Sequence, residues 1–328
     1  MKNVLVIEPF IQEGMALFEA RSDVNVTVLP SPDPDAIREA IVDAHGVTVR
    51  LAKLPEDILA LAPNLEVVSR HGVGCDAIAV DYLTGRGVPV AIASGANSNS
   101  VAEHTLMMLL SLVRGAAAYD RTTREAVWRD RALPQTIELA DRTILIIGFG
   151  RIGRLVAALC RAFGMRVLLR DIALDTERAE RLGCKPVDDY RAALEEADFV
   201  TLHVPLADDT RNMIGADEIA RMRDGAYLIN CARGGIVDET ALVEGLKSGK
   251  LAGAGLDVFE QEPVQPGHPI FDLPNVILSP HSSAMTEEGM RRMGVMTAAN
   301  VLDHFDGKLR PDCVFNPEVL ETMQAKAS

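Results

Sequence analysis

The sequence lacks the features that mark secreted, membrane-spanning and metal-binding proteins. It has only five cysteines in 328 residues, with no CxxC pair and no Cys/His cluster at metal-ligand spacing. Its most apolar segment, residues 106–113, is too short to cross a bilayer, which takes roughly 18 apolar residues. Glu8 interrupts the apolar start of the chain too early for a signal peptide. These absences predict reduced thiols, no metal site, and a cytoplasmic protein that does not enter a membrane.

Positive charge is scarce as well. Lys and Arg number 33 against 47 Asp and Glu, which gives a formal net charge of −14. Because nucleic-acid binding needs a concentrated basic surface, this balance argues against a nucleic-acid partner. The hydrophobic fraction of 48% and the charged fraction of 24% are ordinary for a globular protein. The length suits two domains, or one large one.

A glycine motif follows a strongly apolar run in the middle of the chain. Residues 143–155 read TILIIGFGRIGRL, with Gly148, Gly150 and Gly153 in GxGxxG spacing. In a dinucleotide-binding turn, these glycines permit a tight turn, a close approach of backbone to pyrophosphate, and close packing of helix on strand. The following helix would direct N–H groups and its positive dipole end at the phosphates. GxGxxG alone is a weak signal, so the residues around it carry the inference.

Asp171 adds the second element of a dinucleotide site. After the motif, LVAALCRAF has helical spacing, and RVLLRD predicts a strand that ends at Asp171. Asp171 lies 23 residues beyond Gly148, close to the roughly 20 expected for the carboxylate that binds the adenosine ribose hydroxyls. An acid at this position repels a 2′-phosphate and favours NAD over NADP, although the adjacent Arg170 could offset that repulsion.

Short apolar runs alternate with helix-like runs along most of the chain. The first group of predicted strands is VLVI, VNVTVL, GVTV, LEVVS and VPVAI; six more, TILII, RVLL, FVTLH, AYLIN, AGAGLDVF and VILS, follow from Thr143. This alternation predicts parallel sheets covered by helices. SVAE, from Ser100, has the capping-box pattern and predicts the start of a helix that runs to about Tyr119.

We therefore predict an α/β protein with two doubly wound parallel-sheet domains, a Rossmann nucleotide-binding domain inserted in a flavodoxin-like substrate domain. The substrate domain is predicted to be discontinuous, because about forty residues remain after the last strand, too few for a third domain. Its expected bounds are 1–99 plus 287–328, and those of the NAD-binding domain are 100–286.

Ligands gather at the carboxyl ends of the strands in an open parallel sheet, so the residues that follow each strand are candidates for chemistry. Three of these ends supply Arg233, His281 and a glutamate, either Glu260 or Glu262. Histidine, with an ordinary pKa of about 6.5, exchanges a proton near neutrality, and a neighbouring carboxylate stabilises its protonated form. Arginine grips a carboxylate with its planar fork. The set suits the oxidation of a 2-hydroxy acid with NAD, while spacing alone does not choose between the two glutamates.

With these motifs, the chain resembles the D-isomer-specific 2-hydroxyacid dehydrogenase family, which includes phosphoglycerate dehydrogenases and hydroxypyruvate reductases. The matching segments, in order, are RHGVGCDAIAVDYLTGRGVPV, NSNSVAEHTLMMLLSLVR, GFGRIGR, HVPLADDTRNMI, INCARGGIVDE, GLDVFEQEP and LSPH. The resemblance implies that the catalytic acid is Glu262, which precedes Pro263, with Arg233 and His281 as its catalytic partners. It also implies a homodimer, and a short form of the enzyme with no room for the extra C-terminal regulatory domain.

The resemblance and the strand ends together define the predicted binding residues. Those predicted to bind NAD are Gly148, Gly150, Arg151, Ile152, Gly153, Asp171, His203, Pro205, Cys231, Ala232, Asp257, Ser283 and Ala284. Those predicted to bind substrate are Arg50, His71, Val73, Gly74 and Arg233. The expected substrate is a small D-2-hydroxy acid or 2-oxo acid of the hydroxypyruvate or 3-phosphoglycerate type. Arg50, Lys53, Arg70 and His71 are candidates for binding a second anionic group, or are solvated charges.

Two other functions stay open. An NAD(H)-sensing protein related to corepressors would keep the fold and the triad without catalysing turnover. A formate- or phosphite-type dehydrogenase would oxidise an anion that has no hydroxyl-bearing stereocentre and would use the histidine differently. The intact triad favours the hydroxy-acid enzyme over the sensor.

Overall fold

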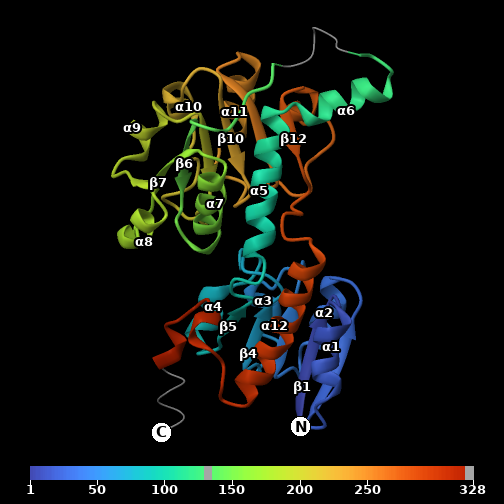
Figure 1. Cartoon of the computed structure of the whole chain (residues 1–328). Coiled ribbons are helices and arrows are strands. Elements are labelled where there is room, and N and C mark those ends of the chain that lie inside the picture. The colour runs from blue at the N-terminus through green and yellow to red at the C-terminus, as the bar shows by residue number, and fades with distance from the viewer. Residues whose placement is uncertain (129–134, 322–328) are drawn as a thin grey trace. The chain divides into compact units, whose positions relative to one another are not determined.

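The structure is a computed structural model that describes residues 1–128 and 135–321 (Figure 1). The chain divides into two compact units. One comprises residues 1–97 together with the segment from Met285 onward, and the other comprises residues 98–284. Each unit is built around its own parallel sheet. Among the described residues, no helix combines the length and the apolar character needed to cross a membrane.

The first unit alternates strands and helices up to residue 92 and is completed by the C-terminal segment. Its strands are β1 (Lys2–Ile7), β2 (Val24–Leu29), β3 (Gly46–Val49), β4 (Val67–Arg70) and β5 (Val90–Ile92). Its helices are α1 (Gln12–Glu19), α2 (Pro34–Ala40), α3 (Glu56–Leu59), α4 (Val80–Gly85) and α12 (Glu287–Phe305), and a short 3-10 helix spans Pro311–Cys313. The strand order β2-β1-β3-β4-β5 is that of flavodoxin-like sheets.

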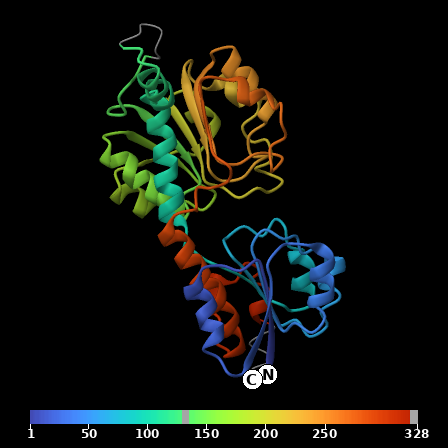
Figure 2. The same ribbon diagram turned by 90° about the vertical axis from the view of Figure 1, so that its right-hand side faces the viewer.

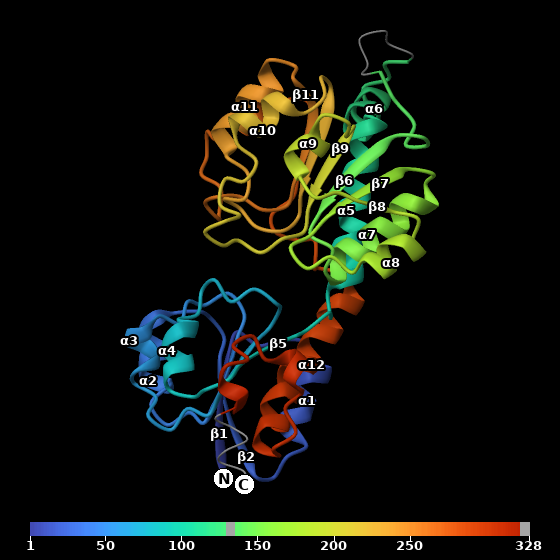
Figure 3. The same ribbon diagram turned by 90° about the vertical axis from the view of Figure 1, so that its left-hand side faces the viewer.

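Helices cover both faces of this first sheet (Figure 3). Ile37, Ile58 and Leu83, from α2, α3 and α4, join one buried core. On the other face, Phe18 of α1 packs in a second core with Val301 of α12. Figure 2 shows α12 beside α1. The C-terminal helix is thus an integral layer of the first unit.

The second unit begins with two helices and then alternates strands and helices. Its strands are β6 (Thr143–Ile147), β7 (Arg166–Arg170), β8 (Lys185–Pro186), β9 (Phe199–Leu202), β10 (Ala226–Asn230), β11 (Leu251–Leu256) and β12 (Val276–Leu278). Its helices are α5 (Ser98–Val113), α6 (Ala116–Arg124), α7 (Arg151–Ala162), α8 (Thr176–Arg181), α9 (Tyr190–Leu194), α10 (Ala216–Arg221) and α11 (Glu239–Lys247), with a 3-10 helix at Pro269–Asp272.

The order of this sheet, β12-β11-β10-β9-β6-β7-β8, contains the doubly wound nucleotide-binding pattern. It reverses direction between β6 and β9, so the loops after these two strands flank the crevice where ligands bind in such folds. All five residues of β6 are buried, as a central parallel strand requires. Helices α5 and α7 cover one face, and α9, α10 and α11 cover the other. The predicted fold of two doubly wound parallel sheets is confirmed.

Two details of the prediction are wrong. The second sheet has seven strands and not six, because the two-residue strand β8 pairs with β7. The helix predicted from Ser100 begins at Ser98, so Ser100 lies within its first turn and does not cap it. That helix also ends at Val113, because Gly115 takes a left-handed conformation with φ of 58° before α6 begins.

Candidate active site

Gly148 and Gly150 lie in the turn between β6 and α7, Gly153 lies in the first turn of α7, and close backbone contacts require glycine at Gly148 and Gly153. Gly148 has φ of 100°, and a Cβ there would lie 2.4 Å from the carbonyl oxygen of His203. A Cβ on Gly153 would lie 1.9 Å from the carbonyl oxygen of Gly148. Gly150 has nothing within 4 Å of its Cβ position and caps α7 without a side-chain hydrogen bond. The open first turn of α7 therefore fits an anion such as a pyrophosphate.

Asp171 follows β7, the strand beside β6, and its carboxylate reaches back to the glycine turn. One carboxylate oxygen accepts the N–H of Phe149 at 2.6 Å, and the other accepts the N–H of Ala173 at 2.9 Å. The guanidinium of Arg170 bonds the carbonyl oxygen of Asp171. The carboxylate is thus fixed at the edge of the glycine turn, where a ribose would lie beside a bound pyrophosphate.

The remaining predicted cofactor residues follow the other strands at the same edge of the sheet. His203 and Pro205 follow β9, Cys231 and Ala232 follow β10, Asp257 follows β11, and Ser283 and Ala284 come after β12. Burial raises the pKa of the Cys231 thiol to about 12, so it is not a nucleophile at neutral pH.

His281 and Glu262 form a hydrogen-bonded pair. The Nδ1 atom of His281 lies 2.7 Å from Oε2 of Glu262, while Oε1 of Glu262 accepts the N–H of Phe259 at 3.0 Å. Burial raises the pKa of the Glu262 carboxyl, but its hydrogen bonds to His281 and Phe259 outweigh burial and hold the pKa below its ordinary value. Because an ionised carboxylate only accepts, Nδ1 carries the hydrogen, which leaves Nε2 to exchange a proton.

Asp257 holds the turn that carries His281. Its side chain is fully buried, and its Oδ1 accepts the hydroxyl of Ser279 at 2.5 Å and the N–H of Ser282 at 2.8 Å. Its Oδ2 accepts the N–H of Ser283 at 2.9 Å, and its backbone carbonyl accepts the N–H of His281 at 2.7 Å. These bonds stabilise the left-handed φ of 53° at His281, which a residue other than glycine rarely adopts.

Arg233 lies on a turn after β10 that a buried asparagine closes. The amide of Asn230 donates to the carbonyl of Arg233 at 2.8 Å, and its oxygen accepts the N–H of Ala232 at 3.0 Å. The next residue, Gly234, packs directly on the segment that carries Glu262: a Cβ there would lie 1.8 Å from the carbonyl oxygen of Phe259. The segments that carry Arg233 and Glu262 are therefore in backbone contact.

Sequence reasoning missed two polar residues behind this network. His104, on α5, places its Nε2 atom 2.9 Å from the hydroxyl of Ser279. Because that hydroxyl donates its hydrogen to Asp257, His104 is the donor to Ser279. His104 stands in the segment NSVAEHTL, whose likeness to the family does not by itself assign it a role. Its position on a helix, away from any strand end, gave no signal of a role.

The structure gives the two glutamates near the strand end different partners. Glu262 pairs with His281, whereas Oε1 of Glu260 accepts the N–H of Glu239 at 3.2 Å. Only Glu262, of these two, is hydrogen-bonded to His281.

The predicted substrate residues lie in the first unit, in and beside the loop after β4. The guanidinium of Arg70 donates to the carbonyls of His71, at 2.7 Å, and Gly74, at 2.9 Å, and so closes the loop. Within the described residues, the N–H groups of Val73 and Gly74 find no acceptor. His71 is buried and stacks on Phe10.

The basic side chains around this loop differ in their ability to attract an anionic group. Burial, with the nearby charges of Arg50 and Arg70, lowers the pKa of His71 to about 4, so its ring is neutral at pH 7. Lys53 is exposed and Arg50 is half-buried. Arg50 and Lys53 are therefore better candidates than His71 for attracting a second anionic group.

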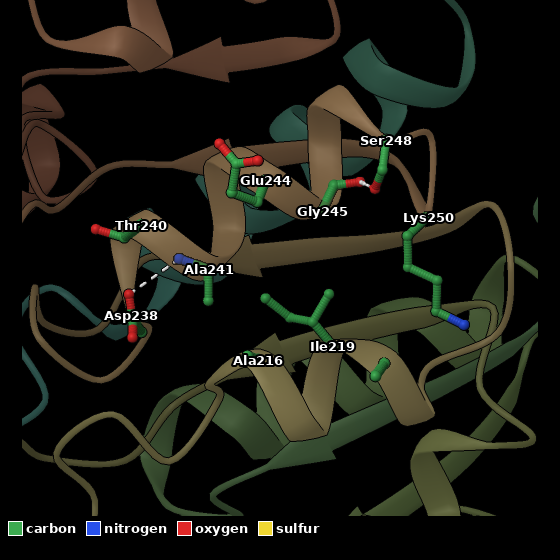
Figure 4. A pocket seen from close by; sticks show the side chains of 10 residues that line it. Ala216, Ile219, Asp238, Thr240, Ala241, Glu244, Gly245, Ser248 and Lys250 are labelled. Carbon is green, nitrogen blue, oxygen red and sulfur yellow. Dashed lines mark hydrogen bonds between the residues drawn. The ribbon is translucent and has the colours of Figure 1, made fainter.

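A shallow groove of about 520 Å³ lies elsewhere on the second unit, between α10 and α11 (Figure 4). Ile219 and Ala241 line its middle, with Asp238 and Lys250 toward its ends. None of the predicted site residues lines it, and Lys250 is paired with Asp224 at 2.8 Å.

Comparisons with known proteins give a consistent result. Residues 106–283 match the NAD binding domain of the D-isomer specific 2-hydroxyacid dehydrogenases. The chain is 37% identical over 324 residues to glyoxylate reductase of Korarchaeum cryptofilum, covering 97% of each protein. It is 38% identical over 320 residues to D-3-phosphoglycerate dehydrogenase of Methanocaldococcus jannaschii, covering 97% of this chain but 60% of that protein. The chain thus spans about three fifths of that relative's length.

A solved structure agrees with these matches. The structure of D-lactate dehydrogenase from Aquifex aeolicus, complexed with NAD and lactic acid, superposes with a TM-score of 0.85 at 31% sequence identity. The alignment covers 94% of this chain and 96% of that one.

Proposed function

Because the chain belongs to the D-isomer specific 2-hydroxyacid dehydrogenase family, we propose that it is an NAD-dependent oxidoreductase that interconverts a small D-2-hydroxy acid and its 2-oxo acid. The observation that carries this proposal is the pairing of His281 with Glu262 at 2.7 Å, on the sheet edge that also carries the glycine turn. A cofactor sensor that keeps the same triad is separated from this enzyme by the turnover measurement below.

The catalytic roles follow from the contacts. When bound, NAD supplies the chemistry of hydride acceptance, or of hydride donation in its reduced form. In the oxidative direction, Nε2 of His281 takes the proton of the substrate hydroxyl, and Glu262 stabilises the resulting imidazolium. In the reductive direction, the imidazolium returns that proton to the carbonyl oxygen. Arg233 binds the substrate carboxylate with its guanidinium.

The cofactor-binding roles rest on the turn after β6 and on its neighbours. The N–H groups of Arg151 and Ile152, at the start of α7, would bind the pyrophosphate. Asp171 would bind the ribose hydroxyls and reject a 2′-phosphate, which favours NAD. The rest of the cofactor site would be lined by the strand-end residues His203, Pro205, Cys231, Ala232, Ser283 and Ala284. Asp257 would act near the nicotinamide, through the turn that it holds.

The substrate class is proposed to be that of hydroxypyruvate or 3-phosphoglycerate. Val73 and Gly74 would bind the substrate through their N–H groups, which the closure of the loop by Arg70 supports. Arg50 and Lys53 are the cations that would favour a phosphate or sulfonate at the far end of the substrate.

A substrate panel tests this proposal. NADH oxidation is measured with glyoxylate, hydroxypyruvate, phosphohydroxypyruvate, sulfopyruvate and pyruvate, in the wild type and in His281→Ala. We expect turnover with at least one 2-oxo acid, and its loss in His281→Ala with NADH binding retained. Tight NADH binding without turnover of any 2-oxo acid would favour the NAD(H) sensor. NAD reduction by formate or phosphite alone would favour the formate- or phosphite-type dehydrogenase. Arg50→Ala should lower kcat/KM for the phosphorylated and sulfonated substrates more than for glyoxylate.

We also propose that the protein acts in the cytoplasm as a homodimer. All five cysteines are buried and free, which suits a reducing compartment. Three large apolar side chains are exposed on or just after α6: Tyr119, Val127 and Trp128, the last of which is 76% exposed. A second copy of the chain would bind to an apolar surface of this kind. Light scattering coupled to size-exclusion chromatography tests the dimer, and Trp128→Glu should shift it toward monomer.

A further inference from the structure

A second acid–histidine pair lies beside the segment that carries Glu262. Glu239 is the first residue of α11, and its side chain is 14% exposed. Its Oε1 atom accepts the N–H of Glu260 at 2.6 Å, and its Oε2 atom lies 3.1 Å from Nε2 of His268. Nothing in the proposed reaction uses either side chain.

The hydrogen-bond partners of His268 direct its ring hydrogen toward Glu239. The Nδ1 atom of His268 accepts the N–H of Ile270 at 3.3 Å, so it carries a lone pair. The ring hydrogen is then on Nε2, which donates it to Glu239. The side chain of His268 is 23% exposed, and its ring meets Phe271 edge-on. His268 thus fixes the orientation of the Glu239 carboxylate.

The bond between Glu239 and Glu260 is reciprocal, because the N–H of Glu239 also donates to Oε1 of Glu260 at 3.2 Å. Two bonds therefore join the start of α11 to residue 260. From there, the path to the proposed acid is short: Phe259 donates its N–H to Glu262, and Glu262 pairs with His281.

We infer that Glu239 and His268 are positioning residues that hold the segment 259–262 so that Glu262 stays aligned with His281. This inference rests on the proposed function, since alignment matters only if the pair exchanges protons. The bonds of Glu239 and His268 reach the segment from α11 and the loop of His268, whereas Gly234 contacts it from the turn after β10.

The test compares Glu239→Gln with two controls. A glutamine can accept only one of the two hydrogen bonds, since its other terminal group is a donor. We expect kcat for 2-oxo acid reduction to fall on the order of ten- to a hundredfold, as small misplacements of reacting groups do. The KM for NADH should stay within about twofold. Reductive activity should also begin to fall at a lower pH than in the wild type, because Glu262 no longer supports the imidazolium.

The controls separate positioning from general damage. Glu244→Gln alters an exposed acid on the same helix, 3.5 Å from Lys247, and should match the wild type. Glu260→Ala removes one of the two bonds between residues 239 and 260 but keeps the N–H that Glu239 accepts, so its kcat should fall less than that of Glu239→Gln. A purely structural role would lower the melting temperature of Glu239→Gln while leaving kcat and its pH profile unchanged, and that result overturns the inference.

The outcomes also separate this inference from the proposed function. A wild type that is inactive on the whole substrate panel refutes the function. An active wild type with an equally active Glu239→Gln refutes only the positioning role. If Glu239→Gln does not fold, His268→Asn carries the test, because it leaves the bond from Glu260 to Glu239 in place. His268→Asn should lower kcat several-fold with the same direction of pH shift, and unchanged values would refute the role of the pair.

Discussion

Replacing Gly234 by alanine tests whether the turn of Arg233 and the segment of Glu262 form one rigid unit. The added Cβ would lie 1.8 Å from the carbonyl oxygen of Phe259 and 2.7 Å from the nitrogen of Glu260. Real Cβ contacts below 3.0 Å essentially do not occur, so the two backbones must separate by roughly 1 Å or more. Since a displacement of about 1 Å near reacting groups can lower a rate about a hundredfold, we expect kcat/KM to fall by that order.

Steady-state NADH oxidation with the best 2-oxo acid of the panel measures the effect, and NADH fluorescence titration checks that the cofactor still binds. Gly85→Ala is the matched control, because Gly85 lies in α4 with nothing within 4 Å of its Cβ position. Alanine is favoured over glycine in a helix, so this control should be as active and at least as stable as the wild type. A Gly234→Ala enzyme with wild-type kcat/KM would show that the contact does not align Arg233 with Glu262.

Three further predictions follow from single contacts. Glu262→Gln should lower kcat at least tenfold and move the fall of reductive activity toward lower pH, while Glu260→Gln should do neither; equal effects in a pH-rate series would contradict the choice of acid. Asp171→Asn should raise the ratio of kcat/KM for NADPH over NADH roughly tenfold, since the neutral side chain no longer repels a 2′-phosphate; an unchanged ratio would exclude Asp171 as the selector. The pKa of His71, lowered to about 4, means that only the unfolded chain binds its proton between pH 6.5 and 4, so stability falls as the pH drops through that window. In urea unfolding, His71→Phe should lose about 3 kcal/mol less than the wild type between pH 7 and pH 4, and an equal loss would refute the burial of a neutral ring.

The sequence predicted the fold class because its signals are local. Apolar strands such as β6 are continuous runs between turn residues, and their alternation with helices favours a parallel sheet. The misplaced helix start at Ser100 and the missed strand β8 are also local in origin. A capping-box pattern occurs inside helices too, and a two-residue strand has no periodicity to detect.

The candidate site was predictable to the level of strand ends and no further. Gly148, Asp171 and His281 each follow a strand, so topology alone places them on one edge of one sheet. The choice between Glu260 and Glu262 needed the resemblance, because two residues of spacing separate them and both are acids. The hydrogen bond from His281 to Glu262 now supports that choice independently.

The contacts that no motif indicated share a physical reason for being missed: each joins segments that are distant in the sequence. Asp257 holds the turn of His281 from another strand, Gly234 supports the segment of Glu262 from another turn, and His104 reaches Ser279 from a helix. Their effect depends on side-chain and backbone atoms meeting within 3 Å, which spacing along one chain does not encode. Because each proposed catalytic group is fixed by a partner from a different strand or helix, its alignment depends on the packing of the whole sheet edge. Substitutions that shift this packing should therefore lower kcat more than they weaken cofactor binding. The reason is that the glycine turn and Asp171 support cofactor binding separately.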